Sequence, residues 1–317
     1  MKGTCSQESC FLQEVGCKLG HSDLGSCPFW TAPKADHEAA ASPEPDDQRA
    51  NPPWTGRSLG RSDLISVATR GRPTLIGLVG PAQSGKTTFL AALYLMLLQG
   101  GRIAEYTFAG SLTLDGWEGL AGWMRWAEIG CPPPFPPHTS SAQGDHLPGI
   151  LHLALRDRLG QRHDVLFTDA PGEWFSRWAV KANAQEAEGA RWIVSNAAGF
   201  LLFADSENLA GSDFGTARRG LRDLMERLSP LLDGRPVGLI WSKSDIDVPA
   251  QLVESLTEAQ RKFLKGAVTH RVSIRAPQTI LASSSALVSA ALVRPLPKPI
   301  QSPVVASDPF LAFRWQR

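Results

Sequence analysis

The sequence predicts an α/β fold in which helices cover both faces of a mostly parallel sheet. From residue 63 onward, short apolar runs typical of buried strands alternate with longer stretches typical of helices. Hydrophobic residues make up 43% of the 317 residues, so the chain can bury a substantial core. We therefore expect one large domain at residues 63–292.

The predicted elements follow one another in a regular order along this domain. Residues 74–80 form a first strand that ends in glycine, and a helix follows from Lys86 until Gly100 and Gly101 stop it. Further strands are predicted at 150–157, 163–170, 199–206, 236–245 and 278–286. Further helices are predicted at 111–129, 216–232 and 248–264.

The segments outside this domain differ from it in composition. Residues 1–30 form a small leader that contains four of the five cysteines. Residues 31–62 are rich in proline, alanine and charge and have almost no aliphatic side chains. They cannot bury enough surface to fold, so we expect a flexible linker. Residues 293–317 form a tail that is first Pro-rich and then aromatic.

Charge and hydropathy exclude several classes of partner. The net charge of +1 gives no support for binding to nucleic acid or to an acidic membrane surface. The N-terminus lacks the apolar core of a secretory signal. The longest apolar run, residues 89–98, is shorter than the roughly 20 residues that span a bilayer. The sequence therefore predicts a soluble, cytoplasmic protein.

A glycine-rich loop joins the first predicted strand to the first helix. Residues 80–87, GPAQSGKT, match the Walker A pattern G-x-x-x-x-G-K-[ST]. Glycines permit the sharp turn, and the inward N–H groups with the helix N-terminus bind anionic phosphate. The alternative is a chance match on an ordinary strand–turn–helix.

Each side chain of this loop has an expected role in holding a nucleotide. Lys86 reaches the β- and γ-phosphates, Thr87 gives its hydroxyl to Mg²⁺, and Thr88 contacts the α-phosphate. The residues that we assign to nucleotide binding here are Gly80, Gln83, Ser84, Gly85, Lys86, Thr87 and Thr88.

A second motif, DAPG, follows the strand predicted at 163–170. Asp169 at the strand end can hold a water molecule on Mg²⁺. Gly172 can present its N–H to a γ-phosphate, so this loop can sense whether that phosphate is present. The alternative interpretation is a plain turn that contains proline and glycine.

A third motif, SKSD, follows the strand predicted at 236–245. The Asp245 carboxylate can accept from both N1–H and the exocyclic amine of guanine, a donor pair that adenine lacks. The aliphatic stem of Lys243 can lie across the base. Backbone N–H groups around Ser284 and Ser285 are predicted to complete the base pocket.

With these three motifs in this order, residues 70–290 resemble a TRAFAC-type P-loop GTPase with a Ras-like sheet. More narrowly, the residues that flank the motifs and the Cys-rich leader are similar to those of the bacterial double-GTPase families. The resemblance implies GTP and GDP as ligands, Mg²⁺-dependent GTP hydrolysis, and a protein partner, with a second GTPase encoded nearby. It also implies a switch in a multi-component signalling or conflict (defence) system.

The chain departs from the family pattern at two positions. Ser242 replaces the usual Asn or Thr, and its hydroxyl ties the base loop to the phosphate loop more weakly than an amide. Glu173 stands where Ras-like proteins carry the Gln that orients water, so we expect slow intrinsic hydrolysis by Lys86, Gly172 and Glu173. No residue is identified as an arginine finger, and a surface ion pair is expected for Arg177.

The threonine that completes the Mg²⁺ shell in the first switch is not fixed by a tight motif. Thr139, upstream of the strand at 150–157, is our choice, and Thr107 and Thr113 are rivals. The tryptophans near the second switch, Trp174, Trp178 and Trp192, are interpreted as core residues, with a partner surface as the alternative.

The leader offers soft metal ligands in a short segment. Four thiolates and the His21 imidazole can bind Zn²⁺ and stabilise a segment too small to fold alone. The predicted ligands are Cys5, Cys10, Cys17 and Cys27. A reduced, unstructured leader and redox-active disulfides are the alternatives.

Two other functions stay open at this point. A P-loop ATPase or nucleotide kinase would require that Asp245 does not bind guanine. A scaffold that binds nucleotide without hydrolysing it is favoured by Glu173.

Overall fold

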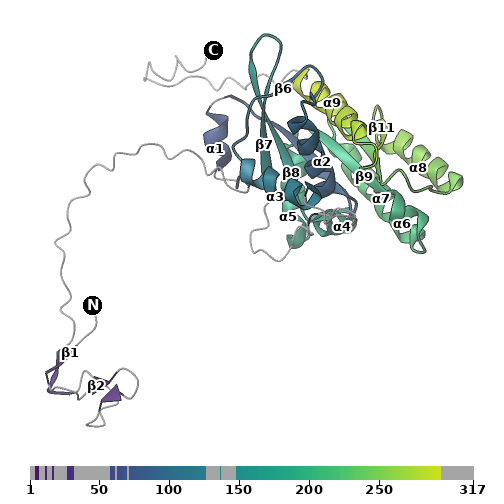
Figure 1. Cartoon of the computed structure of the whole chain (residues 1–317). Coiled ribbons are helices and arrows are strands. Elements are labelled where there is room, and N and C mark those ends of the chain that lie inside the picture. The colour runs from purple at the N-terminus through teal and green to yellow at the C-terminus, as the bar shows by residue number, and fades with distance from the viewer. Residues whose placement is uncertain are drawn as a thin grey trace, which may run out of the picture. The chain divides into compact units, whose positions relative to one another are not determined.

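The computed structural model divides into two compact units, residues 1–51 and 52–317, which we describe separately (Figure 1). The residues that the structure describes are 4–6, 11–12, 16–17, 27–31, 58–60, 63–69, 71–125, 136 and 148–293.

The first unit contains two short antiparallel ribbons. Strand β1 (Thr4–Cys5) pairs with β4 (Trp30–Thr31), with Cys5 opposite Trp30. Strand β2 (Phe11–Leu12) pairs with β3 (Gly16–Cys17), with Phe11 opposite Cys17. The backbone of the turn before β4 is closed by a bond from the Trp30 N–H to the Cys27 carbonyl at 3.1 Å.

The second unit is built on a seven-stranded sheet in the order β11-β10-β9-β5-β8-β7-β6. The parallel strands are β5 (Thr74–Val79), β8 (Arg162–Asp169), β9 (Gly199–Asp205), β10 (Val237–Ser242) and β11 (Val268–Arg271). Two antiparallel strands, β7 (Gly149–Arg156) and β6 (Thr107–Phe108), complete one edge. The predicted α/β fold with a mostly parallel sheet is confirmed.

Helices cover both faces of the sheet, as Figure 1 shows. One face carries α2 (Lys86–Leu98), α3 (Leu114–Arg125) and α9 (Gln278–Val293). The other carries α1 (Asp63–Ala68), α4 (Gly172–Val180), α5 (Glu188–Asn196), α7 (Phe214–Leu228) and α8 (Ala250–Phe263). A short helix, α6 (Ser206–Ala210), directly follows β9.

The central strand explains why the sequence shows continuous apolar runs instead of alternation. Successive side chains of a strand point to opposite faces. In β5, Leu75 and Val79 pack into the core on the α4 side, and Ile76 and Leu78 pack into the core on the α2 side. Because both faces are covered, the buried side chains of β5 are apolar on both faces.

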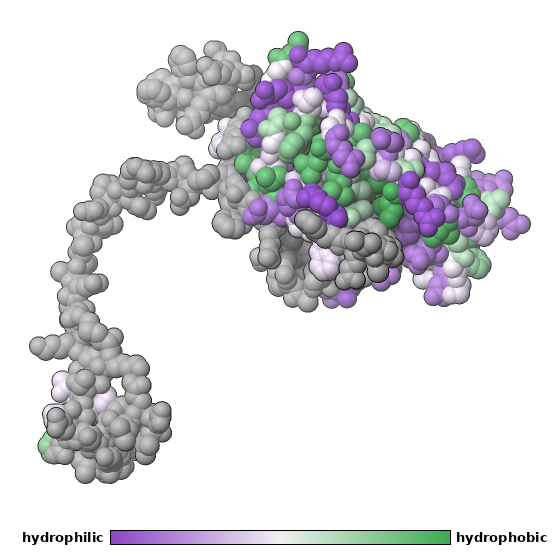
Figure 2. Space-filling model, in the orientation of Figure 1, coloured by the Kyte–Doolittle hydropathy of each residue, from purple (hydrophilic) through white to green (hydrophobic). Residues whose placement is uncertain are grey.

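Helix α2 is also apolar all round, because it packs between the sheet and neighbouring helices. Its partners in the core include residues of α3 and α9. In Figure 2, apolar residues gather near the middle of the visible face of the second unit, and hydrophilic residues lie around them. Among the helices described, none is both long and apolar enough to cross a bilayer.

The prediction of a strand at 278–286 is wrong, because these residues begin helix α9. Its buried side chains recur with helical spacing at Ile280, Ser284, Leu287 and Ala291. The strand that extends the sheet is β11, which is largely exposed at the edge and lacks the apolar run on which the strand predictions rest. Helices α4 and α5, which follow the second motif, were not predicted either.

Candidate nucleotide-binding site

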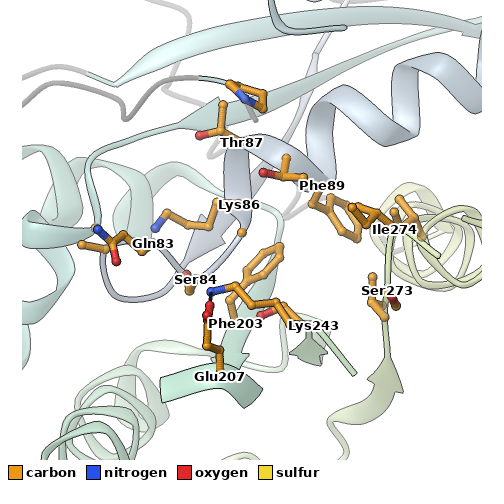
Figure 3. A pocket seen from close by; sticks show the side chains of 18 of the residues that line it. Gln83, Ser84, Lys86, Thr87, Phe89, Phe203, Glu207, Lys243, Ser273 and Ile274 are labelled. Atoms are coloured by element: carbon orange, nitrogen blue, oxygen red, sulfur yellow. Dashed lines mark hydrogen bonds and ion pairs between the residues drawn. The ribbon is translucent and has the colours of Figure 1, made fainter. Parts of the chain in front are cut away.

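A cavity of about 530 Å³ lies at the carboxyl ends of the parallel strands, where open α/β sheets bind ligands. Loops after β5, β8, β10 and β11 and the first turn of α6 contribute its walls (Figure 3). Five segments of the sequence therefore meet at one site.

The phosphate loop has the backbone geometry of an anion site. Gln83 and Gly85 adopt positive φ angles of 60° and 84°, and α2 begins at the next residue, Lys86. No side chain caps the N-terminus of α2, and the N-terminal end of a helix favours bound anions. A Cβ on Gly80 would lie 2.9 Å from atoms of Phe203 and Ser84, so only glycine fits against β9 here.

Lys86 lies inside this loop and bonds to its backbone. Its Nζ donates to the carbonyls of Gly80 at 3.0 Å and Pro81 at 2.8 Å, and the residue is 6% exposed. Burial lowers the pKa of Lys86 to about 8, and nearby carboxylates oppose this shift. Those carboxylates belong to Asp169, Glu173 and Asp205. A bound phosphate would add negative charge beside the ammonium group and stabilise its charged form.

Two of the three predicted Mg²⁺ ligands, Thr87 and Asp169, meet directly. The Thr87 hydroxyl donates to Asp169 Oδ1 at 2.9 Å, although 82 residues separate them in the sequence. Hydroxyl and carboxylate oxygens are the ligands that Mg²⁺ prefers. The pair therefore fits a Mg²⁺ ion that also touches phosphate.

The DAPG loop packs against the phosphate loop. Helix α4 begins at Gly172, and a Cβ built on this residue would overlap the backbone of Pro81 and Ala82. Glycine is therefore required for the two loops to approach this closely. Glu173 follows in the first turn of α4, is exposed, and lines the cavity.

The buried residues of α4 beyond Gly172 pack in the core. Trp174 and Trp178 are 4% and 2% exposed within the core, and Trp192 packs against the same core from α5. Their interpretation as core residues is confirmed. Arg177 forms the expected surface ion pair, with its nitrogen 3.9 Å from Glu186 and both side chains more than half exposed.

The base side of the cavity is built around Asp245. Its Oδ1 accepts a hydrogen bond from the Ser273 hydroxyl at 2.7 Å, and Arg275 Nε lies 3.4 Å from Oδ2. The Ser273 bond holds the pKa of Asp245 below its usual value, so the carboxylate is charged at neutral pH. Ser242 is buried, and its hydroxyl donates at 3.2 Å to the Ala204 carbonyl of β9, not to the phosphate loop.

Lys243 is the second polar side chain of the base loop, and it lies in the left-handed region with φ 52°. Its Nζ lies 3.0 Å from Asp205 Oδ2 and 2.7 Å from Glu207 Oε2. Burial alone would lower the pKa of Lys243, but the bonds to Glu207 and Asp205 outweigh it and raise that pKa.

The prediction that backbone N–H groups around Ser284 and Ser285 complete the base pocket is wrong. Both lie within α9, Ser284 is fully buried, and the Ser285 hydroxyl accepts from the Ala104 N–H at 2.8 Å. Backbone N–H groups inside a helix bond within the helix and cannot serve a base. The loop after β11, residues 273–275, lines the cavity instead.

Sequence reasoning missed several cavity residues. They are Phe203, Glu207, Ser273, Ile274 and Arg275, together with Asp205, which does not line the cavity but pairs with the cavity residue Lys243. Asp205 carried a usable signal, because it ends an apolar strand as Asp169 does. The other residues follow no motif in the sequence.

Several predicted metal ligands lie outside the described residues. They are Thr139, Cys10 and the side chains of Cys5 and Cys17. Cys27 is buried and forms no disulfide with a described cysteine. Within the described part of the chain, no group of three or more histidine, cysteine or acidic residues is arranged to hold a metal.

The rival threonines bond at the β6 edge of the sheet. Thr107 donates to the Arg156 carbonyl at 3.2 Å, and the Thr113 hydroxyl accepts from the His152 N–H at 2.9 Å. Neither residue lines the cavity.

Comparison with known proteins gave one family. The model of a family described as Double-GTPase 2 matches residues 74–292, which is more than half of the chain and includes all three motifs. No curated protein matches the chain.

Proposed function

Because this chain belongs to the Double-GTPase 2 family, whose description supports a GTP-binding GTPase, we propose that it is a Mg²⁺-dependent GTPase that works as a slow nucleotide-controlled switch. The observation that carries the proposal is the convergence of the phosphate loop, the Thr87–Asp169 pair and Asp245 on one cavity. A nucleotide has matching parts: phosphates, a metal ion and a base.

In this proposal the phosphates lie on the N–H groups of residues 83–88, and Lys86 leaves its carbonyl partners to pair with them. Thr87 and Asp169 hold Mg²⁺, which neutralises charge on the phosphate oxygens. The Gly172 N–H contacts the γ-phosphate, and its close approach to the phosphate loop supports this role. Thr139 remains the proposed Mg²⁺ ligand from the first switch.

Guanine specificity is assigned to Asp245. The carboxylate is charged and oriented by Ser273, so its oxygens can accept from N1–H and the exocyclic amine of guanine. Adenine offers no such donor pair, and an ATP-binding site would not require this carboxylate.

Hydrolysis is the slow step of the switch. Water attacks the γ-phosphorus, the bond to the β–γ bridging oxygen breaks, and GDP and phosphate form. Lys86 stabilises charge that develops on the bridging oxygen. Glu173 lines the cavity as an exposed carboxylate, which can accept a proton from the water but also repels the phosphates. A partner that supplies positive charge would therefore accelerate the reaction.

Calorimetry with GDP, GTP, ADP and ATP in magnesium buffer tests this proposal, followed by measurement of phosphate release. We expect binding of both guanine nucleotides in preference to the adenine nucleotides, and slow release of phosphate from GTP. Equal affinity for ADP and GDP would contradict the guanine assignment.

The exposed Glu173 favours one alternative, a scaffold that binds GTP without hydrolysing it. Single-turnover experiments that show no phosphate release with or without a partner would establish that alternative.

A second GTPase, encoded nearby, is the proposed partner in a cytoplasmic multi-component signalling or conflict system. The family description, Double-GTPase, supports a pair of GTPases. Co-purification of the chain with the product of a neighbouring GTPase gene, in the presence of a GTP analogue and not of GDP, would support this assignment.

Zinc binding by the leader remains part of the proposal. The backbone register places Cys5 opposite Trp30, and Phe11 opposite Cys17, in the two ribbons of the first unit. The Cys27 carbonyl bonds to the Trp30 N–H, so Cys5 and Cys27 share one ribbon. Elemental analysis of protein purified without chelators should find about one zinc per chain. Metal-free protein would contradict the site.

A further inference from the structure

Two carboxylates from one segment hold the ammonium group of Lys243. Asp205 ends β9 and Glu207 lies in the first turn of α6. Their oxygens lie 3.0 Å and 2.7 Å from Lys243 Nζ. Figure 3 shows the Lys243 side chain extended toward Glu207, beside the phosphate loop at Ser84.

The two carboxylates differ in how firmly they are placed. The Asp205 side chain is 2% exposed and also accepts from the Glu207 N–H at 3.1 Å and from Asn208 Nδ2 at 2.8 Å. The Glu207 side chain is 63% exposed and makes only its bond to Lys243 among the described contacts. Asp205 is therefore a rigid anchor, and Glu207 adds a weaker, solvated contact.

A buried carboxylate beside a site for polyphosphate has an electrostatic cost. Burial raises the pKa of Asp205, and the bond from Lys243 opposes that shift. A bound nucleotide would add several negative charges nearby. The lysine is therefore the partner that makes a charged Asp205 tolerable at this position.

The pairing also fixes the direction of the lysine stem. A free lysine side chain samples many rotamers. Here its backbone is set by the left-handed φ and its ammonium group by two carboxylates, so the four-carbon stem is held at both ends. Asp245, two residues further on, bonds to Ser273 and Arg275 instead.

We propose that Asp205 and Glu207 are positioning residues for guanine recognition: they hold the ammonium group of Lys243 at the α6 side of the cavity. The lysine stem then forms a flat apolar surface under the purine. Asp245 stays free of the lysine and can accept from the base. The inference rests on the proposed guanine site at Asp245.

The proposal predicts different effects on two ligands, GDP and magnesium tripolyphosphate, which has a phosphate chain but no base. Asp205→Asn removes the buried one of the two carboxylates that hold Lys243, so GDP affinity should fall about tenfold or more. The same change removes a negative charge near the phosphates, so affinity for tripolyphosphate should stay within about twofold or rise. Glu207→Gln should lower GDP affinity only about threefold, because its carboxylate is exposed.

A double-mutant cycle tests whether Asp205 acts through the lysine. Lys243→Met keeps an unbranched apolar stem without the charge. In that background Asp205→Asn should cause no further loss of GDP affinity, because there is no ammonium group left to hold. Asp213→Asn, a change of the same kind at an exposed residue outside the cavity, is the matched control and should leave both affinities unchanged.

The possible outcomes are distinct. Equal losses of GDP and tripolyphosphate affinity in Asp205→Asn would overturn the positioning role and make Asp205 a structural residue. Guanine-selective binding that Asp205→Asn does not weaken would overturn the positioning role alone. Wild-type protein that binds ADP as well as GDP would overturn the guanine site and the positioning role together.

Discussion

The phosphate side and the base side of the cavity are built in different ways. The phosphate side is one continuous stretch, residues 80–88, joined by Asp169 and Gly172 from a single further loop. Its shape is set locally, by the left-handed residues Gln83 and Gly85 and by the start of α2.

The base side, in contrast, is assembled from loops after β9, β10 and β11. Its polar side chains are held by bonds between segments, from Ser273 to Asp245 and from Lys243 to Asp205. The proposed phosphate binding thus depends on one short segment between a strand and a helix. The proposed base selection depends on how three neighbouring strands are aligned.

The largest expected effect follows from removing the central cation of the phosphate side. Lys86→Ala should weaken binding of GDP and tripolyphosphate alike, by about a hundredfold or more, because a buried charge-assisted contact to phosphate is lost. Calorimetry with both ligands measures this. The change should not affect one ligand more than the other.

Lys265→Ala is the matched control, since Lys265 is an exposed lysine just after the end of α8. Circular dichroism of the Lys86 variant establishes that the fold survives the loss of a buried side chain. Micromolar GDP affinity in Lys86→Ala would remove the phosphate-loop assignment.

The contrast between the two sides also explains what could be predicted from the sequence. The phosphate loop, Asp169 and Gly172 were identified because each follows an apolar strand and obeys a fixed local spacing. Asp245 was identified for the same reason, at the end of β10. The α/β fold follows from strands that are apolar on both faces, such as β5.

The loop after β11, residues 273–275, could not be predicted in this way. Strand β11 is short and largely exposed, so its sequence VTHR shows no strand pattern, and Ser273 has no motif around it. The apolar and small residues at 278–286 fit a strand or a helix equally, and their helical form is decided by packing on the sheet. Lys243 gives no sign in the sequence that Asp205 is its partner, because 38 residues separate them.

The second prediction addresses the base side alone. Asp245→Asn replaces an acceptor of the guanine N1–H and amine by an amide, so GDP affinity should fall about thirtyfold. Xanthosine diphosphate, which has a carbonyl in place of that amine, should bind the variant more tightly than it binds wild type. Tripolyphosphate affinity should be unchanged. Competition calorimetry with the three ligands makes the comparison.

Asp247→Asn provides a control two residues away, at an exposed carboxylate that does not line the cavity. If Asp245→Asn kept the wild-type preference for GDP over xanthosine diphosphate, the base would have to be recognised elsewhere.

A smaller effect is expected from the residue that orients Asp245. Ser273→Ala removes the 2.7 Å bond to Oδ1, so GDP affinity should fall about fivefold while tripolyphosphate binding stays unchanged. The same bond lowers the pKa of Asp245, so its loss raises that pKa. As the pH is lowered, the variant should therefore begin to lose GDP affinity at a higher pH than wild type does. Ser212→Ala, at an exposed loop serine, is the control. If GDP affinity fell at the same acidic pH in the variant as in wild type, the orienting role would be contradicted.

The smallest effect is a proton linkage that belongs to the phosphate side. Burial lowers the pKa of Lys86 to about 8 in the empty site, and bound phosphate raises it. Binding must therefore take up protons: at pH 8 about half a proton per GDP. Affinity should then decline by up to about threefold from pH 7.5 to 8.5 as the free lysine loses its charge. Calorimetry in buffers of different ionisation enthalpy measures the uptake directly.

Variants on the two sides should respond differently in this measurement. Lys86→Arg carries a guanidinium that stays charged over the whole range, so the uptake should disappear at whatever affinity remains. Asp245→Asn should keep the wild-type uptake, because Asp245 is already charged at these pH values and its removal leaves Lys86 in place. Proton uptake that persists in Lys86→Arg would assign the linkage to another group. Uptake that vanishes in Asp245→Asn would show that the two sides are electrostatically coupled and do not act as separate halves.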